Sequence, residues 1–203
     1  NAEVLHDINL TLDEGCKLAL VGPSGGGKST IGKLIAGFWD PTKGAVRIGG
    51  ADVRDISLEE AGKLISYVSQ DAFLFDATIE ENLRIGRPSA TSEEIVEAAR
   101  AAGCHDFIAS LPQGYQTSTG LGGRYLSGGE RQRVTIARAM LKDAPIVVMD
   151  EATAFTDPDS EAQIETALSA LVRDKTLVVI AHRLSTVRDA DCIAVVDAGR
   201  IVA

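Results

Sequence analysis

The chain has 203 residues, enough for one domain with a substantial core. Hydrophobic residues make up 45% and charged residues 24%, as in soluble globular proteins. The net charge of −9 argues against broad binding to nucleic acid or anionic lipid, and no apolar run approaches the roughly 18 residues that a membrane helix needs. Three widely spaced cysteines, Cys16, Cys104 and Cys192, are typical of reduced thiols in a cytosolic compartment.

The first seventy residues are predicted to form strands around one helix. Apolar and polar residues alternate over 8–12, which predicts a half-buried strand, and the continuous apolar run at 17–21 predicts a buried one. We expect a helix from Lys28 to about Phe38 and a strand over 44–50 that ends in a Gly-Gly turn. A further strand over 65–69 ends at Gln70.

Helical patterns dominate from about residue 78 to 115. Ser92 and the two acidic residues after it favour a helix start, and this helix continues to Gly103. Another helix is predicted over 130–141, with Val134, Ala137 and Leu141 on one face. Beyond it, buried strands over 146–149 and 176–180 flank a helix at about 159–173, and the last strands cover 192–196 and 200–202.

Strands that alternate with helices predict an α/β fold with a largely parallel sheet. We place a catalytic core in 1–77 and 142–203 and an inserted helical subdomain in about 78–141. The chain begins without an initiator Met and stops inside a strand-like segment. We therefore expect a domain that is truncated at both ends.

A phosphate-binding loop is predicted between the strand at 17–21 and the next helix. Residues 22–30 match G-x-x-x-x-G-K-[ST] in the strand-to-helix setting that this motif requires. Lys28 would contact the β- and γ-phosphates, Ser29 would ligate Mg²⁺, and Thr30 would donate to the α-phosphate. The glycines would point backbone N–H groups into one anion-binding concavity, and the alternative is a glycine turn without a ligand. The predicted nucleotide-binding residues of this loop are Gly22, Pro23, Ser24, Gly25, Gly26, Gly27, Lys28, Ser29 and Thr30.

Two carboxylates follow the buried strand at 146–149. Successive strand residues point to opposite sides, so Asp150 and Glu151 need not share a role. We predict that Asp150 holds the Mg²⁺ shell and that Glu151 polarises the attacking water as general base. The structural alternative is an acidic cap over the next helix.

Polar residues also follow two other predicted strands. His182 comes after the strand at 176–180, at the edge where ligands bind in parallel sheets, and is predicted to contact the γ-phosphate. The neutral amide of Gln70 would bind Mg²⁺ or the attacking water. A lone histidine at a strand end is more often structural. The functional prediction for His182 therefore depends on the sequence around it, residues 180–184.

A second glycine turn precedes the helix at 130–141. It is formed by Leu126, Ser127, Gly128, Gly129 and Glu130. Ser127 offers a hydroxyl, and the two glycines expose N–H groups where the helix dipole is positive. The sequence therefore predicts two phosphate-binding turns in one chain.

The chain resembles the nucleotide-binding domain of ATP-binding cassette (ABC) ATPases. The resemblance rests on five motifs in the same order: the phosphate loop, Gln70, the second glycine turn, the acid pair at 150–151 and His182. The resemblance covers nearly the whole chain, and residues 68–76 and 181–187 are most similar to the exporter-type subgroup. It implies a P-loop NTPase core of α/β class with a mostly parallel sheet, an antiparallel β subdomain and an inserted helical subdomain. It also implies ATP and Mg²⁺ as ligands, and ATP hydrolysis that powers transport.

The resemblance further implies two protein partners. One is a second nucleotide-binding domain, identical or not, in a head-to-tail dimer where Ser127, Gly128 and Gly129 close on the γ-phosphate held by the other subunit's Lys28. Asp157 would lie in the loop that crosses between the two sites. The other partner is a transmembrane domain, at the cytoplasmic face of the inner membrane, while the fragment itself would be soluble. No nucleic-acid partner is expected.

Three features depart from the family pattern. The subgroup usually has Ser-Ala-Leu-Asp after the catalytic acid, whereas residues 154–157 are Ala-Phe-Thr-Asp, a form similar to that of exporter-fold transporters for iron–siderophore complexes. Leu121 stands where a glutamate often precedes the second glycine turn, so contact with the transmembrane domain is expected to differ. No aromatic residue that would stack on adenine is visible, because Tyr67 and Tyr115 lie elsewhere, and weaker ATP binding is expected.

Other functional classes fit less well. A soluble ABC ATPase that acts on DNA or ribosomes would show a coiled-coil insertion, a second cassette or a basic surface, which the acidic charge and compact length disfavour. A GTPase or nucleotide kinase is disfavoured because no guanine-binding motif Asn/Thr-Lys-x-Asp is present. Residues 42–45 match its first two positions but have Ala45 where the motif requires Asp. A module that binds nucleotide without turnover is a further alternative.

Overall fold

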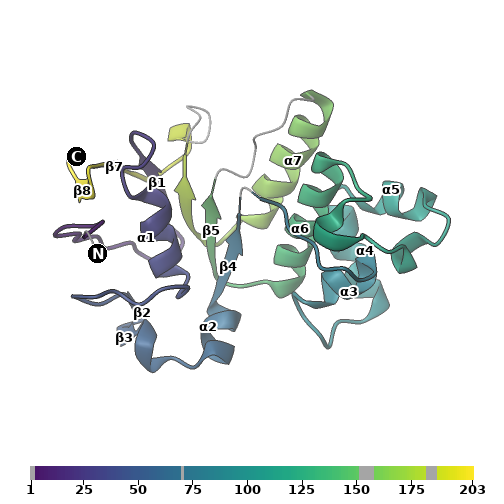
Figure 1. Cartoon of the computed structure of the whole chain (residues 1–203), viewed down its shortest axis with the longest axis horizontal. Helices are drawn as coiled ribbons and strands as arrows, with labels where there is room; N and C mark the ends of the chain where they lie inside the picture. The colour runs from purple at the N-terminus through teal and green to yellow at the C-terminus, as the bar shows by residue number, and fades with distance from the viewer. Residues whose placement is uncertain (1–2, 70, 151–157, 182–186) are drawn as a thin grey trace. The chain divides into compact units, whose positions relative to one another are not determined.

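The computed structural model describes residues 3–69, 71–150, 158–181 and 187–203 (Figure 1). These residues divide into two compact units. The first lies within 1–67, 145–151 and 174–203, and the second lies within 68–144 and 152–173. The domain limits expected from the sequence, at 77/78 and 141/142, stay a prediction.

The first unit is built on a sheet whose strand order confirms the α/β prediction. Among the described residues the order is β4-β5-β6-β1-β7-β8, with β5/β6, β6/β1 and β1/β7 parallel and β7/β8 antiparallel. The carboxyl ends of β1, β5 and β6 therefore meet at one edge, where phosphate sites form in such folds. The strands are β1 (Lys17–Val21), β4 (Ile65–Val68), β5 (Ile146–Asp150), β6 (Thr176–Ile180), β7 (Cys192–Asp197) and β8 (Arg200–Ile201).

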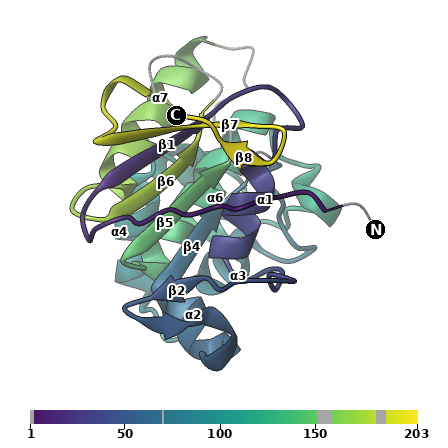
Figure 2. The same cartoon turned by 90° about the vertical axis from the view of Figure 1, so that its left-hand side faces the viewer.

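One face of this sheet is covered by α1 (Lys28–Ile35), which Figure 2 shows lying across the strands. The helix approaches closely because Gly32 has no side chain: a Cβ there would lie 2.9 Å from Cδ1 of Ile180 and 3.3 Å from Cγ1 of Val148. The aliphatic core beneath the helix comes from five strands and from α1. It consists of Leu18, Leu20, Ile31, Ile65, Val148, Val178, Ile180, Ala194 and Val196.

A short antiparallel hairpin follows α1. Strands β2 (Arg47–Ile48) and β3 (Ala51–Asp52) pair antiparallel across Gly49 and Gly50, both with positive φ, as a two-residue hairpin turn requires. The predicted strand over 44–50 is thus confirmed in a shortened form. A 3₁₀ turn (Val53–Asp55) and α2 (Leu58–Leu64) lead on to β4.

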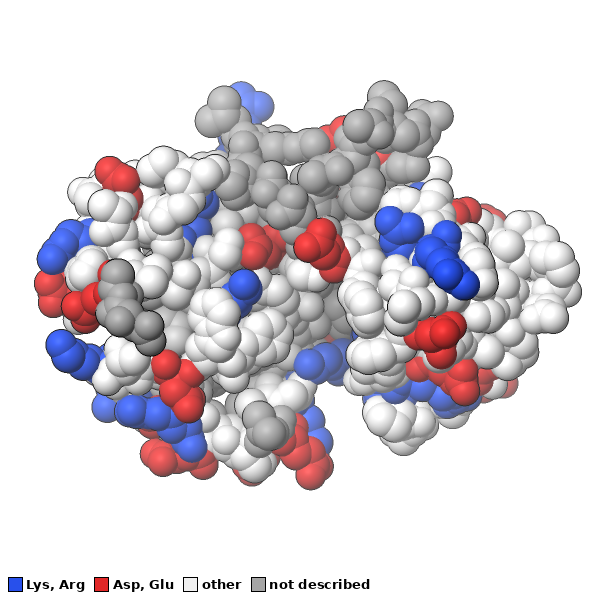
Figure 3. Space-filling model, in the orientation of Figure 1, with Lys and Arg blue, Asp and Glu red and all other residues white. Residues whose placement is uncertain are grey.

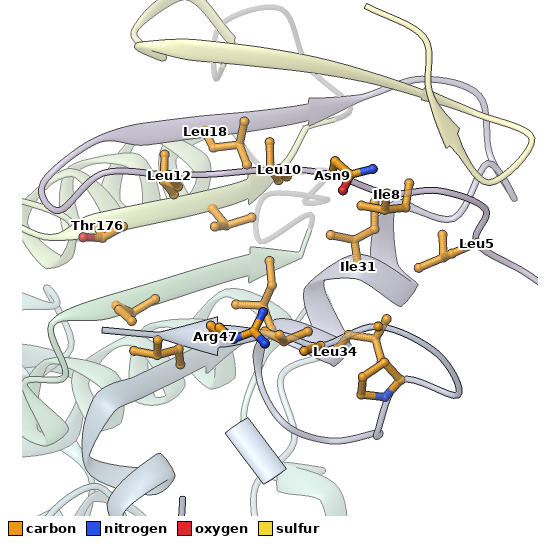
Figure 4. A pocket seen from close by; sticks show the side chains of 18 of the residues that line it. Leu5, Ile8, Asn9, Leu10, Leu12, Leu18, Ile31, Leu34, Arg47 and Thr176 are labelled. Carbon is orange, nitrogen blue, oxygen red and sulfur yellow. The ribbon is translucent and has the colours of Figure 1, made fainter. Parts of the chain in front are cut away.

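The prediction of a strand over 8–12 was wrong, because none of the described residues pairs with this segment as a strand. Its alternation is real, since Ile8 and Leu12 are half-buried while Leu10 is more exposed. However, the segment borders a cavity of about 1060 Å³ (Figure 4), which residues of β2 also line. The segment and the hairpin therefore face each other across this space, and alternation alone could not supply the missing neighbouring strand.

The second unit is helical and centres on α6 (Gly128–Lys142). Val134, Ala137 and Leu141 are buried on one side of this helix, as predicted. Around it pack α3 (Ile79–Arg84), α4 (Ser92–Ala101) and α7 (Pro158–Leu171). The remaining short elements are α5 (His105–Ser110) and two 3₁₀ turns (Gly114–Gln116 and Leu121–Gly123). In the described part of the chain, no helix combines the length and the apolar character that crossing a membrane demands.

Candidate nucleotide-binding site

The phosphate loop connects the carboxyl end of β1 to the start of α1, as the motif predicts. Gly22, Gly25 and Gly27 have φ values of +139°, +79° and +108°, where side chains are disfavoured. At Gly22 the space is also closed, because a Cβ would lie 2.0 Å from the carbonyl oxygen of Val196. At Gly25 a Cβ would meet nothing within 4 Å, so the loop stays open at its tip. This cradle is the concavity that a phosphate needs.

Helix α1 begins at the loop without a side-chain cap. Its N-cap residue, Gly27, is in the left-handed conformation and makes no side-chain hydrogen bond. The first N–H groups of any helix lack intrahelical partners, and here they belong to Lys28, Ser29 and Thr30. These N–H groups and the positive end of the helix dipole are therefore available to an anion.

Lys28 folds back over this cradle. Its ammonium donates hydrogen bonds to the carbonyl oxygens of Gly22 and Pro23, both at 2.9 Å, and the residue is only 4% exposed. A buried cation requires acceptors, and the loop carbonyls supply them. Phosphate oxygens could replace these carbonyls without moving the charge far, so the loop and its lysine fit a bound phosphate chain.

Asp150 ends β5 beside the start of α1. The Ser29 hydroxyl donates to Oδ1 of Asp150 at 3.3 Å, and the Tyr67 hydroxyl donates to Oδ2 at 3.0 Å. Partial burial, and next the negative charge of Asp150, raise the pKa of the Tyr67 phenol, so it stays a donor at neutral pH. A carboxylate and a hydroxyl are oxygen ligands of the kind that Mg²⁺ prefers, so Ser29 and Asp150 fit the predicted metal role.

The second glycine turn begins α6 in the helical unit. The Ser127 hydroxyl accepts a hydrogen bond from the N–H of Glu130 at 3.3 Å, and Oε2 of Glu130 accepts from the N–H of Ser127 at 2.7 Å. This reciprocal pair is a capping box. Gly128 and Gly129, the first two helical residues, retain the N–H groups that such a cap leaves unpaired. The Ser-x-x-Glu spacing is a signal that could have predicted this cap.

Four predicted site residues, Gln70, Glu151, Asp157 and His182, lie outside the described residues, and their roles stay predictions. Within the first unit, the structure brings Ser29 of the phosphate loop together with Asp150. Sequence reasoning missed Tyr67 as a neighbour of Asp150. Its place in the alternating strand before Gln70 was the available signal, but the partner strand was not known from the pattern.

The chain is similar to known proteins over nearly its whole length. The family model described as ABC transporter matches residues 5–154. The chain is 51% identical to the mycobactin import ATP-binding/permease protein IrtA of Mycolicibacterium smegmatis, over 98% of this chain and 23% of the relative. It is 50% identical to the ATP-dependent lipid A-core flippase of Syntrophus aciditrophicus, over 98% of this chain and 33% of the relative.

A solved structure of a bacterial Atm1-family ABC exporter with ATP bound superposes with a TM-score of 0.91 at 43% identity. The match covers 100% of this chain and 35% of that one, so the chain spans about a third or less of the length of these proteins. Because the family model covers most of the chain and identity is high throughout, the chain belongs to the ABC transporter family, as a nucleotide-binding domain of that family.

Proposed function

We propose that this domain binds ATP together with Mg²⁺ and hydrolyses the ATP to power transport across a membrane through a transmembrane partner. The observation that carries the proposal is the contact between the Ser29 hydroxyl and the Asp150 carboxylate, 3.3 Å apart, next to a glycine cradle with a buried lysine. An anion site and an oxygen-ligand pair are then adjacent within one unit. That combination suits a metal-bound nucleoside triphosphate.

The phosphate chain would lie against the loop and the first turn of α1. Lys28 would exchange its hydrogen bonds to Gly22 and Pro23 for hydrogen bonds to the β- and γ-phosphates. Ser29, Asp150 and Gln70 would hold Mg²⁺, and Thr30 would donate to the α-phosphate. When bound, Mg²⁺ supplies positive charge that neutralises the phosphate oxygens.

Hydrolysis would proceed by in-line attack of water on the γ-phosphorus. Glu151 would accept the proton of the attacking water, the bond to the β–γ bridging oxygen would break, and ADP and phosphate would leave. His182 and Gln70 would keep the water and the γ-phosphate aligned. The contribution of the protein is then mainly positioning and charge stabilisation.

The second glycine turn would complete the site of a second nucleotide-binding domain in a head-to-tail dimer. Two features support this role: Gly128 and Gly129 present N–H groups at a helix start, and the Ser127–Glu130 cap holds the turn in one conformation. Asp157 would lie in the connection between the two sites. The partner domain could be identical or a related chain.

A transmembrane domain would be the other partner, at the cytoplasmic face of the membrane. Within the helical unit, Phe73 and Phe75 are about half exposed with their rings 5.3 Å apart, and Leu121 is 67% exposed. Exposed apolar side chains of this size are typical of contact surfaces. One similar protein is a mycobactin import ATP-binding/permease protein and another is an ATP-dependent lipid A-core flippase, so the relatives differ in substrate. The resemblance therefore concerns the ATP-using domain rather than the cargo.

We do not expect a nucleic-acid partner. The net charge is −9, and Figure 3 shows acidic and basic side chains interspersed over the face that it draws. Nucleic-acid binding would require a basic surface that neutralises many phosphates. These properties support the transport proposal over a role on DNA or ribosomes.

The Glu151→Gln variant tests the proposed reaction. Because the amide cannot accept the proton of the attacking water, we expect ATP binding to persist, hydrolysis to stop and an ATP-held dimer to accumulate. Phosphate release and gel filtration with ATP measure these outcomes in the full-length protein. Glu165→Gln, an exposed carboxylate on α7, is the matched control and should hydrolyse ATP normally. Undiminished turnover in Glu151→Gln would remove Glu151 from its role.

A further inference from the structure

Tyr67 and Ser29 hold the Asp150 carboxylate between them. Ser29 reaches Oδ1 from α1, and Tyr67 reaches Oδ2 from β4, the strand next to β5 in the sheet. Each carboxylate oxygen therefore has one hydroxyl donor of its own. The two donors come from different elements, so the carboxylate is fixed relative to both the helix and the sheet.

The position of the Tyr67 ring is itself well determined. Its backbone belongs to β4, and its ring packs against Phe38, with ring centroids 5.0 Å apart and an interplanar angle of 57°. Tyr67 also lies at the margin of the aliphatic core beneath α1. The phenol oxygen is thus placed by packing rather than by the hydrogen bond to Asp150 alone.

An aspartate carboxylate needs such a constraint because rotation about its last side-chain bond is soft. That torsion has broad minima, so a carboxylate with one partner samples several orientations. A donor on Oδ2 limits the rotation and leaves Oδ1 directed at Ser29. Outer hydrogen bonds of this kind orient the ligands of metal sites and raise their affinity.

We infer that Tyr67 is a positioning residue, whose hydroxyl orients Asp150 for the Mg²⁺ that accompanies ATP. The inference rests on the proposed function, since it needs Asp150 to act in the metal shell. It assigns the effect to the hydroxyl and not to the ring. Tyr67→Phe separates the two, because phenylalanine keeps the packing against Phe38 and loses only the donor.

The experiment compares nucleotide binding with and without the metal in the full-length protein. The dissociation constant of the non-hydrolysable analogue AMP-PNP is measured by calorimetry in EDTA and in excess Mg²⁺. The constant in EDTA divided by the constant in Mg²⁺ gives the contribution of the metal to binding. In Tyr67→Phe this ratio should fall roughly tenfold, while the constant in EDTA stays unchanged. Tyr115→Phe, which loses a phenol that contacts His105 in the helical unit, should leave both constants unchanged.

Two outcomes would overturn the inference. Normal binding of AMP-PNP by Tyr67→Phe both in EDTA and in Mg²⁺ would show that the hydroxyl does not act through the metal. Weaker binding by the same factor in EDTA and in Mg²⁺ would show a general structural role. The Asp150→Asn variant distinguishes a failure of the inference about Tyr67 from a failure of the proposed function. If Asp150→Asn also keeps the normal ratio, Asp150 is not in the metal shell. If only Asp150→Asn loses the ratio, the proposed function stands and the inference about Tyr67 is wrong.

Discussion

Two glycine turns in this chain precede helices, yet they are built differently. In the phosphate loop, Gly22, Gly25 and Gly27 have positive φ, and α1 begins without a side-chain cap. In the second turn, Gly128 and Gly129 have helical backbone angles, and Ser127 caps α6. The first turn needs glycine for its backbone conformation, whereas the second does not.

The difference indicates what each turn can bind. The phosphate loop leads into a helix start without a side-chain cap and has its own buried lysine, features that suit an anion site within one chain. At the second turn, the serine hydroxyl and the N–H of Glu130 already pair with each other. Gly129 is buried within the helical unit, so packing in its own chain accounts for a small residue there. Gly128 is only partly buried, and we propose that its missing side chain permits close approach of the partner's nucleotide.

The largest effect is expected at the base of the phosphate loop. Gly22→Ala should lower the free energy of unfolding by roughly 4 kcal/mol, because the new methyl group would overlap the Val196 carbonyl oxygen in an unfavourable φ region. Gly25→Ala also has positive φ but free space, and should cost about 1 kcal/mol. Urea unfolding of both variants measures the difference. Equal losses would show that the close contact at Gly22 does not shape the loop.

The next effect concerns the lysine that distinguishes the phosphate loop. Lys28→Ala should weaken ATP binding by about 3 kcal/mol, roughly 100-fold, because charge-assisted hydrogen bonds to the phosphates are lost. Lys33→Ala removes a lysine of the same helix that lies over the Trp39 ring, and should bind ATP normally. Calorimetric titration with ATP checks both variants. Similar affinities for the two would place the phosphates elsewhere.

A smaller change is expected where glycine has no conformational role. Gly128→Ala should leave the free energy of unfolding unchanged or raise it by less than about 1 kcal/mol, since alanine favours a helix. Hydrolysis should nevertheless fall roughly tenfold, because the methyl group would obstruct the partner's nucleotide. Thermal unfolding and phosphate release measure the two quantities. Normal hydrolysis in a stable Gly128→Ala variant would contradict the partner role of this turn.

The local parts of both turns were predictable from sequence because each depends on a short run of residues. The strand-to-helix setting of the phosphate loop and the buried face of α6 follow from periodicity and motif spacing. The Ser127–Glu130 cap is equally local, and its Ser-x-x-Glu spacing is enough to predict a capping box.

The features that sequence did not reveal depend on contacts between distant segments. The alternation at 8–12 predicted a strand, but a strand also needs a neighbour, and the hairpin lies across a cavity. The hydrogen bond from Tyr67 to Asp150 joins residues 83 apart in sequence. It follows from β4 lying beside β5, and no local pattern gives that strand order.

We propose that the second glycine turn serves the nucleotide of another subunit. Mixing full-length Lys28→Ala and Gly128→Ala proteins tests it most directly, with ATP hydrolysis as the readout. In a head-to-tail dimer of the two, one site combines an intact phosphate loop with an intact second turn. Hydrolysis should therefore rise well above that of either variant alone. If the mixture, shown by crosslinking to contain mixed dimers, hydrolyses ATP no faster than its components do, the two turns do not act across subunits.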